Sequence, residues 1–325
     1  MRAVAVYRHG GPEVLTPVEW TTPVPGPGEV LVDVMLIGVN YHETYELSGL
    51  YPREVPYVPG RELVGTVAAL GDDVDGVTVG DAVATVDVPV PGAYAEQVVL
   101  PAHRLVLVPP GISAEQACAG LLQGMTVRLL THDCHPARPG ETALVHAAAG
   151  GVGLLLTQML NQLGVRVIGT VSTAEKEKAA REAGAHDIIR YTDVDFVSEV
   201  QRLTGRAGVD VVYDAVGDTT FDGSLACLRR QGKLVLYGQS SGKVGPVDVS
   251  TGPLRSKVLT RPYLPDFIVT REELLKRAEI VFDWMGNNQL NAHIERRYRL
   301  ENAVTAHRDL QERRTIGKLL LTPQR

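Results

Sequence analysis

The feature that most constrains the fold is a glycine-containing turn between an apolar strand and a helix. The turn reads AAAGGVG at positions 147–153, after an expected strand at 142–146 and before a helix that begins near residue 151. In that context Gly150 lets the backbone approach a pyrophosphate, and Gly153 lets the helix pack closely on the strand. Ala148 stands where such turns usually have their first glycine, so the motif alone also fits an ordinary tight strand–helix turn.

Strands and helices are expected to alternate around this turn. Strands are predicted at 142–146, 165–171, 187–189, 209–213 and 233–237, and helices at 151–163, 174–183, 194–203 and 219–229. Such alternation is typical of a parallel sheet with crossover helices. It predicts an α/β, doubly wound domain of the Rossmann type and favours the dinucleotide-binding interpretation of the turn. Residues 1–112 have short strand-like runs separated by glycine and proline, which predicts an irregular β domain.

Length and composition exclude several classes of protein. The 325 residues predict two domains. Cys118, Cys134 and Cys227 are odd in number and widely spaced, which excludes a disulfide scaffold and a four-cysteine zinc lobe. The net charge of −6 disfavours nucleic acid as a partner. The N-terminus is predicted to be a strand and not a secretory signal, and no apolar run is long enough for a membrane span. We therefore expect a cytoplasmic protein with no membrane partner.

The end of the strand after the glycine turn predicts which nicotinamide cofactor is bound. Proteins that prefer NAD usually have Asp or Glu there, about 20 residues on, to accept a hydrogen bond from the ribose 2′-hydroxyl. Here the strand ends in Ser172 and Thr173, and Lys176 follows in the first turn of the next helix. Two hydroxyls and a lysine suit a 2′-phosphate, which carries roughly −1.5 to −2 charges, so we predict NADPH. The alternative is that Ser172 or Thr173 only caps the helix and that Lys176 is solvated.

Seven segments together resemble the medium-chain dehydrogenase/reductase superfamily, and within it the zinc-free NADPH:quinone oxidoreductases, which are zeta-crystallin-like. The segments are HGGPEVL (9–15), IGVN (37–40), SGLYP (48–52), QGMT (123–126), HAAAGGVG (146–153), YGQSSG (237–242) and TREEL (270–274). The resemblance covers essentially the whole chain. It implies an NADPH-binding Rossmann-type domain at 116–255 and a partly barrelled, GroES-like β domain at 1–115 that is completed by 256–325. It also implies a homodimer formed through the strands near 233–237 and 258–263.

The positions that hold the catalytic metal in zinc-dependent relatives correspond here to Asn40, Arg61 and Gln123. None of the three is a good zinc ligand, so no metal is expected. Zinc assists the oxidation of an alcohol by stabilising an alkoxide, whereas a quinone or enone carries the charge of an incoming hydride to an oxygen that hydrogen-bond donors can hold. We therefore predict hydride transfer from NADPH to a quinone or related conjugated carbonyl.

Two alternatives to this reaction stay open. The first is an enoyl or alkenal reductase that acts on one carbon–carbon double bond, because the shape of the pocket decides between the two acceptors. The second is an NADPH-binding protein with a structural or regulatory role, because a fold does not fix a function.

The candidate substrate-side residues lie between positions 40 and 51. Asn40 is expected to donate its amide to a carbonyl oxygen or to the nicotinamide ribose. Tyr45 and Tyr51 are candidate proton donors, and their alternative role is packing in the pocket wall. Many relatives have Asp at the position of Glu43 and an aliphatic residue at that of His42, which leaves the choice of substrate open.

The candidate cofactor contacts come from the motifs and from the resemblance. The motifs supply Gly150, Gly151, Val152, Gly153, Ser172, Thr173 and Lys176. The resemblance implies Tyr41, Thr126, Tyr191, Val216, Gly217, Gly238, Ser240, Ser241, Tyr263, Leu264 and Lys318. Tyr191 is expected beside the adenine, or else is a half-buried residue at the edge of the sheet.

Overall fold

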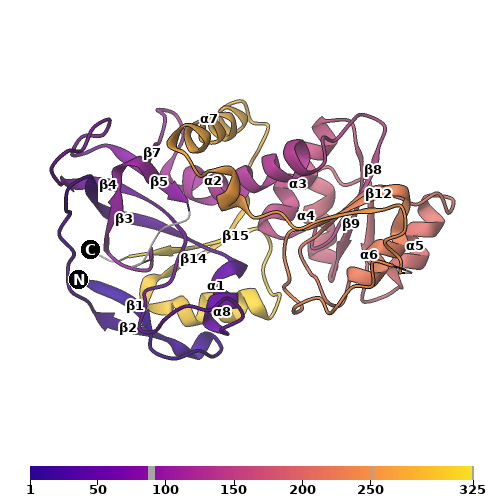
Figure 1. The fold of residues 1–325 in the computed structure, drawn as a ribbon, viewed down its shortest axis with the longest axis horizontal. Coiled ribbons are helices and arrows are strands. Elements are labelled where there is room, and N and C mark those ends of the chain that lie inside the picture. The colour runs from indigo at the N-terminus through magenta and orange to yellow at the C-terminus, as the bar shows by residue number, and fades with distance from the viewer. Residues whose placement is uncertain (87–91, 251, 324–325) are drawn as a thin grey trace. The chain divides into compact units, whose positions relative to one another are not determined.

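The computed structural model describes residues 1–86, 92–250 and 252–323, which divide into two units. Unit 1 comprises Met1–Leu122 and Ile268–Arg325, and unit 2 comprises Gln123–Phe267. Figure 1 shows the consequence for the chain ends: unit 1 contains both the indigo and purple N-terminal elements and the yellow C-terminal ones. Within the described ranges, no helix combines the length and the apolar composition that crossing a membrane requires.

Unit 2 is built around a parallel sheet in the order β10-β9-β8-β11-β12-β13. Its strands are β8 (Thr142–Val145), β9 (Arg166–Val171), β10 (Asp187–Arg190), β11 (Val209–Asp214), β12 (Leu228–Leu236) and β13 (Val258–Thr260). The helices between them are α3 (Gly151–Gln162), α4 (Ala174–Glu182), α5 (Phe196–Leu203) and α6 (Phe221–Cys227). This confirms the predicted α/β, Rossmann-type class. The order reverses between β8 and β11, which is where doubly wound sheets bind ligands.

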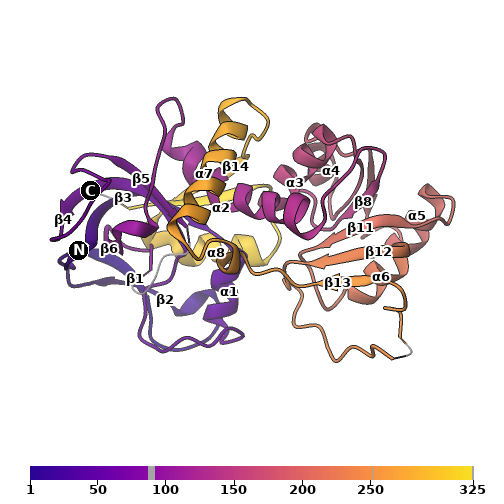
Figure 2. The ribbon, with the colours of Figure 1, turned by 45° about the horizontal axis from the view of Figure 1, so that its top comes forward.

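The end of unit 2 differs from the prediction at one strand. A helix at 219–229 and a strand at 233–237 were expected, but α6 ends at Cys227 and β12 begins at the next residue. The pairing of β11 with β12 shifts register between Val209↔Leu228 and Val211↔Lys233, so the residues between bulge out of the ladder. Gln231 in this bulge has φ +63°, a conformation that neither a helix nor a regular strand contains. Figure 2 shows β13 beside β12 at the edge of the sheet.

Unit 1 contains a hairpin and a seven-stranded mixed sheet. The hairpin strands are β1 (Arg2–Val6) and β2 (Leu15–Glu19), and the sheet strands are β3 (Glu29–Val39), β4 (Glu62–Leu70), β5 (Ala82–Val86), β6 (Gln97–Pro101), β7 (Val106–Leu107), β14 (Ile294–Arg299) and β15 (Lys318–Thr322). The order is β14-β15-β3-β4-β5-β7, and β6 also pairs with β3. The C-terminal β15 pairs antiparallel with β3, so the two ends of the chain share one core.

The helices of unit 1 cover this sheet and connect it to unit 2 along the chain. They are α1 (Tyr41–Leu47), α7 (Arg271–Gly286), α8 (Ala303–Gln311) and the first half of α2 (Ala114–Arg128). Helix α2 passes into unit 2 at Gln123 and continues as a π-helical turn over Leu129–Cys134. Helix α7 begins with a capping box, in which the Thr270 hydroxyl accepts from the Glu273 backbone N–H (3.2 Å) and Glu273 accepts from the Thr270 N–H (2.9 Å).

Candidate active site

The glycine turn of unit 2 has no room for side chains. A Cβ on Gly153 would lie 2.3 Å from the Ala147 carbonyl oxygen, and a Cβ on Gly151 would lie 2.3 Å from the Gln123 amide nitrogen. Gly150 is the N-cap residue of α3, in extended conformation. The first backbone N–H groups of a helix have no partner within it, so Gly151, Val152 and Gly153 present donors where a phosphate is expected.

Three of the predicted 2′-phosphate contacts lie at the junction of β9 and α4. The Thr173 hydroxyl caps the helix, because it accepts from the Lys176 backbone N–H at 3.3 Å. Thr173 therefore caps the helix, as the alternative interpretation of Ser172 and Thr173 proposed. The Lys176 side chain lies in the first turn of α4. Tyr191 directly follows the neighbouring β10 and its side chain is 39% exposed, so it lies beside this junction as an accessible ring.

The loops after β11 and β12 are tied to each other by hydrogen bonds. The Asp214 carboxylate accepts from the backbone N–H groups of Val216 (2.7 Å) and Gly217 (3.1 Å). Ser241 donates both its N–H and its hydroxyl to the Val216 carbonyl, each at 2.8 Å. Gly217 has φ +91°, and a Cβ there would lie 2.9 Å from the Cα of Gln239. The structure thus brings together Val216, Gly217, Gly238, Ser240 and Ser241 at one edge of the sheet.

The other predicted cofactor contacts of unit 2 lie outside these loops. Thr126 is half-buried on α2. Tyr263 and Leu264 follow β13, and Tyr263 is 49% exposed.

Unit 1 holds a buried ion pair at the end of β3. Lys318, at the start of β15, is 1% exposed and donates to Glu62, which is 2% exposed, and also to the Asn40 side-chain oxygen at 2.7 Å. The Asn40 amide nitrogen donates to the same Glu62 carboxylate at 2.9 Å. Gly38 makes room for this cluster, since a Cβ there would lie 2.1 Å from Glu62. Asn40 and Lys318, which were predicted as separate contacts, are therefore held together by Glu62, which was not predicted.

Glu43 is a second buried carboxylate beside this cluster. Its side chain is fully buried, and one oxygen accepts from the Asn40 backbone N–H at 2.9 Å. The other oxygen has no hydrogen-bond partner among the described residues. Burial, and next the charge of Glu46, raise the pKa of Glu43 to about 7. Glu43 is therefore a carboxyl group that exchanges a proton near neutral pH.

The two candidate proton donors lie in an aromatic cluster on and after α1. The ring of Tyr45 lies 5.2 Å from that of Tyr51 and 6.1 Å from that of Tyr41. His42 contacts Tyr51 with ring centroids 5.1 Å apart. Edge-to-face and tilted ring pairs of this kind fix side-chain orientation. The half-buried rings of Tyr45 and Tyr51 thus have defined positions, as either proton transfer or wall packing requires.

Glu46 organises the charges around this cluster. It accepts from Arg61 at 3.0 Å and from Arg53 at 3.1 Å, and it pairs with His42 at 3.5 Å. Burial alone would raise the pKa of Glu46, but hydrogen bonding from His42 and the charge of Arg53 outweigh it, so the pKa is lowered. The sequence prediction did not include Glu46 or Arg53. In the sequence, the one indication of this ion-pair cluster is a glutamate on the same helix as Tyr45, followed by two arginines.

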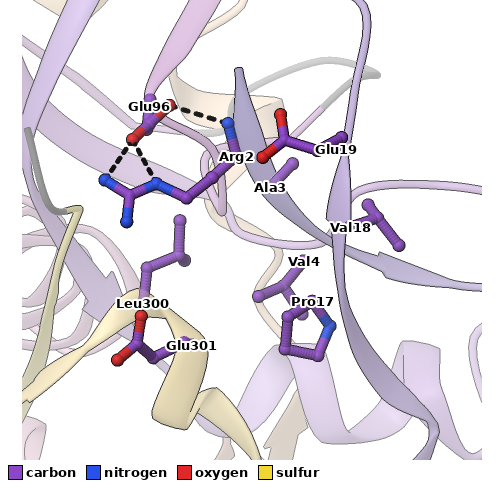
Figure 3. Close-up of a pocket in the computed structure, with 9 residues that line it drawn as sticks. All are labelled: Arg2, Ala3, Val4, Pro17, Val18, Glu19, Glu96, Leu300 and Glu301. Atoms are coloured by element: carbon purple, nitrogen blue, oxygen red, sulfur yellow. Dashed lines mark hydrogen bonds and ion pairs between the residues drawn. The ribbon is translucent and has the colours of Figure 1, made fainter.

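A pocket of about 280 Å³ lies elsewhere in unit 1, between the hairpin and the 3₁₀ turn at Leu300–Asn302 (Figure 3). Arg2 closes one side of it by bonding to Glu96 through its Nε (2.8 Å) and its backbone N–H (2.7 Å). Glu19 and Glu301 also line it. None of its lining residues is a predicted site residue, and the candidate site does not include it.

Comparison with known proteins identifies the family. The zinc-binding dehydrogenase profile matches residues 151–261, and the alcohol dehydrogenase GroES-like domain profile matches residues 26–110. Quinone oxidoreductase of Pseudomonas aeruginosa is 41% identical over 97% of this chain and 97% of its own. The chain belongs to the quinone oxidoreductases of the medium-chain dehydrogenase/reductase superfamily. The resemblance predicted from the seven segments is thereby confirmed.

Two further quinone oxidoreductase relatives are informative. The structure of Escherichia coli quinone oxidoreductase complexed with NADPH superimposes with a TM-score of 0.96, at 39% identity, over 99% of this chain and 100% of that one. The 2-haloacrylate reductase of a Burkholderia species is 38% identical over 99% of both chains. The family therefore includes members whose names denote different acceptors.

In this quinone oxidoreductase, the three residues that the sequence predicts at the zinc positions of relatives each contact other protein groups. Asn40 bonds to Glu62 and Lys318, Arg61 bonds to Glu46, and Gln123 lies against Gly151. Within the part of the chain that the structure describes, no group of three or more His, Cys, Asp or Glu side chains is arranged to hold a metal ion.

Proposed function

We propose that this protein transfers a hydride from NADPH to a quinone or a related conjugated carbonyl compound. One observation carries the proposal. At two positions that the resemblance matches to the metal ligands of zinc-dependent relatives, Asn40 accepts a hydrogen bond from Lys318 and Arg61 pairs with Glu46. A conjugated acceptor does not need a Lewis acid, because hydrogen-bond donors suffice to hold its developing oxyanion. The names of the P. aeruginosa and E. coli relatives support the same reaction.

Unit 2 fits NADPH at each part of the nucleotide. The glycine turn carries no side chain at Gly151 and Gly153, where a Cβ would collide with Gln123 and with the Ala147 carbonyl, and it leads directly into the first backbone N–H groups of α3, which suit a pyrophosphate. Ser172 and Lys176 suit the 2′-phosphate, and no carboxylate ends β9 to repel it. When bound, NADPH supplies the hydride. The protein residues would bind and orient it: the first turn of α3 would hold the pyrophosphate, and the loops at 216–217 and 238–241 would contact another part of the cofactor.

In unit 1, the buried cluster fixes polar groups for the substrate. Lys318 and Glu62 hold the Asn40 amide, which is proposed to donate to the substrate oxygen or to the ribose. Tyr45 and Tyr51 are the proposed proton donors for the product oxyanion. Replacing each with Phe tests this role: loss of kcat by about tenfold or more supports proton donation, whereas unchanged kcat assigns the tyrosines to wall packing.

Reduction of a carbon–carbon double bond is the second candidate function. It is favoured by the 38% identity to 2-haloacrylate reductase. The test is to follow NADPH oxidation with a 1,4-quinone, an alkenal and a 2-haloacrylate as separate acceptors, each with an NADH control. Turnover of the quinone with the highest kcat/KM supports the main proposal, and preference for the haloacrylate or alkenal supports the second. Tight NADPH binding with no turnover of any acceptor would refute both and favour a structural or regulatory role.

We further propose that the protein is a cytoplasmic homodimer that pairs through the β12–β13 edge of unit 2. The support is that β13 is the edge strand of its sheet and exposes Val258 (48%) and Leu259 (37%). The three cysteines form no disulfide within the described residues, which suits a reducing compartment. In analytical ultracentrifugation, Leu259→Lys should shift a dimer to monomer, whereas Val194→Lys, at an exposed site (48%) of the same unit away from β13, should not. A monomeric wild type would refute the proposal.

A further inference from the structure

A line of four polar side chains runs through the interior of unit 2. The Thr170 hydroxyl lies 2.9 Å from Nδ1 of His146, Nε2 of His146 lies 3.0 Å from the Ser224 hydroxyl, and that hydroxyl donates to Oδ2 of Asp214 at 2.8 Å. All four residues are at most 2% exposed. The ring of Phe196 packs edge-on against His146, with centroids 5.0 Å apart. The proposed mechanism uses none of these four side chains.

The hydrogen-bonding rules fix the direction of this line. A carboxylate accepts only, so the single hydrogen of Ser224 points to Asp214. Ser224 must therefore accept from His146, which places the imidazole proton on Nε2. Nδ1 is then an acceptor, and Thr170 donates to it. Burial lowers the pKa of His146, against the opposing effect of the Asp214 charge, which agrees with a neutral ring. Every hydrogen bond in the line thus runs from Thr170 toward Asp214.

Asp214 connects this line to the loop that follows β11. Its Oδ1 accepts from the N–H groups of Val216 and Gly217, and the Thr220 hydroxyl lies 2.9 and 2.8 Å from its two oxygens. No Lys or Arg bonds to this carboxylate among the described residues, so backbone and hydroxyl donors provide its stabilisation. Losing one donor would leave part of this buried carboxylate without a hydrogen bond, so each donor constrains the others.

The line joins three segments that the proposed function assigns to NADPH. Thr170 lies two residues before Ser172, at the 2′-phosphate end of β9. His146 directly follows β8 and opens the glycine turn. Asp214 ends β11 and holds the loop at 216–217. Strands β8 and β11 are the neighbours at which the strand order reverses, so the line crosses the sheet at the expected ligand edge.

From these contacts we infer that His146 and Ser224 are positioning residues for NADPH, which set the spacing of the three cofactor segments through Asp214. The inference rests on the proposed function, because the three segments are assigned to the cofactor by that proposal. An apolar pair at these positions would fill the same space without the cost of burying polar groups. The polar line instead imposes one fixed geometry on the ends of β8, β9 and β11, which must match the bound conformation of the nucleotide.

The test removes one hydroxyl at a time. Ser224→Ala and Thr170→Val each delete a link of the line, and Thr170→Ser keeps the hydroxyl. Thr157→Val is the matched control, because Thr157 is buried on α3 in the same unit and its hydroxyl has no hydrogen-bond partner within the described part of the chain. We expect the Kd for NADPH, measured by fluorescence titration, to rise about tenfold in Ser224→Ala and Thr170→Val, with kcat at saturating NADPH changed less than about threefold. Thr170→Ser and Thr157→Val should bind as the wild type does.

A second readout does not depend on activity. ¹⁵N–¹H NMR of the imidazole should show His146 protonated at Nε2 in the free protein, and amide exchange at Val216 and Gly217 should accelerate in Ser224→Ala but not in Thr157→Val. A proton on Nδ1, or unchanged NADPH affinity in Ser224→Ala with a lowered Tm, would overturn the inference and assign a purely structural role. The titration of the wild type tests the proposed function separately. If the wild type did not bind NADPH, the proposed function would be refuted, and not the inference about His146 and Ser224.

Discussion

Replacing Lys318 with Met removes the positive charge from the buried pair of unit 1 and leaves Glu62 with the Asn40 amide but no counter-charge. Lys318 is 1% exposed and Glu62 is 2% exposed, so water does not replace the lost partner. Breaking a buried pair from one side costs about 3–5 kcal/mol. The carboxyl can escape by binding a proton, and for an ordinary glutamic acid this costs about 4 kcal/mol at pH 7 but only about 1 kcal/mol at pH 5. The loss in unfolding free energy is therefore capped near 4 kcal/mol at pH 7 and shrinks on acidification.

The assay uses the tryptophans as a reporter of this unit alone. Both tryptophans of the chain, Trp20 and Trp284, lie in unit 1, so fluorescence during urea unfolding follows the unit that contains the pair. Lys276→Met, on the exposed face of α7, is the control and should change the free energy by less than about 0.5 kcal/mol. Lys318→Met combined with Glu62→Gln should recover most of the loss, because no unpaired charge stays buried.

The reasoning is refuted by either of two results. One is a loss below about 1 kcal/mol at pH 7 in Lys318→Met, which would mean that solvent reaches Glu62. The other is an equal loss at pH 5 and pH 7, which would mean that packing of the lysine stem, and not its charge, provides the stability.

Three further predictions follow from the same geometry. Burial raises the pKa of Glu43 to about 7, so the folded protein holds a proton there that the unfolded chain releases. The free energy of unfolding of unit 1 should therefore fall by about 3 kcal/mol as the pH rises from 4.5 to 7, and urea unfolding of Glu43→Gln should not show this fall. The same pH dependence in the wild type and in Glu43→Gln would contradict the prediction. Lys176→Ala should raise the Kd for NADPH about tenfold and leave that for NADH unchanged in binding titrations; equal effects would exclude contact with the 2′-phosphate. Gly153→Ala brings a Cβ to 2.3 Å from the Ala147 carbonyl and should weaken NADPH binding more than tenfold and lower the Tm, whereas Gly245→Ala has no atom within 4 Å and should do neither; similar losses in both would contradict the close-approach argument.

The sequence predicted the parallel sheet well because its pattern is local. Apolar strands followed by capped helices recur from residue 142 onward, and the glycine turn lies where the strand order reverses. The bulge between Leu228 and Lys233 was missed, because an extra residue in a ladder depends on the partner strand and has no periodicity of its own. Predicted and observed helix ends therefore disagree most at α6.

The candidate site was predicted less completely, for a related reason. Asn40 and Lys318 were predicted, but no pattern in the sequence around Glu62 marks it as their common partner. Gly38, which makes room for the Glu62 side chain, lies on a different strand, so its role appears only once the strands are paired. Asp214 could have been found: it ends a strand directly before a glycine-containing turn, the same context as His146. Side chains that act through long-range contacts become visible only when the strands are paired.

The pairing of β15 with β3 also fixes when each half of the protein can form during synthesis. All of unit 2 leaves the ribosome before residue 318 is made, so the nucleotide-binding sheet can fold while the chain is still attached. The ammonium of Lys318 must then find Glu62 and Asn40, which are 256 and 278 residues earlier in the chain. Contacts of such long separation form slowly. A nascent chain that stops short of β15 would keep a complete unit 2 beside a sheet whose buried glutamate lacks its counter-charge, which makes such a product a substrate for chaperones and proteases.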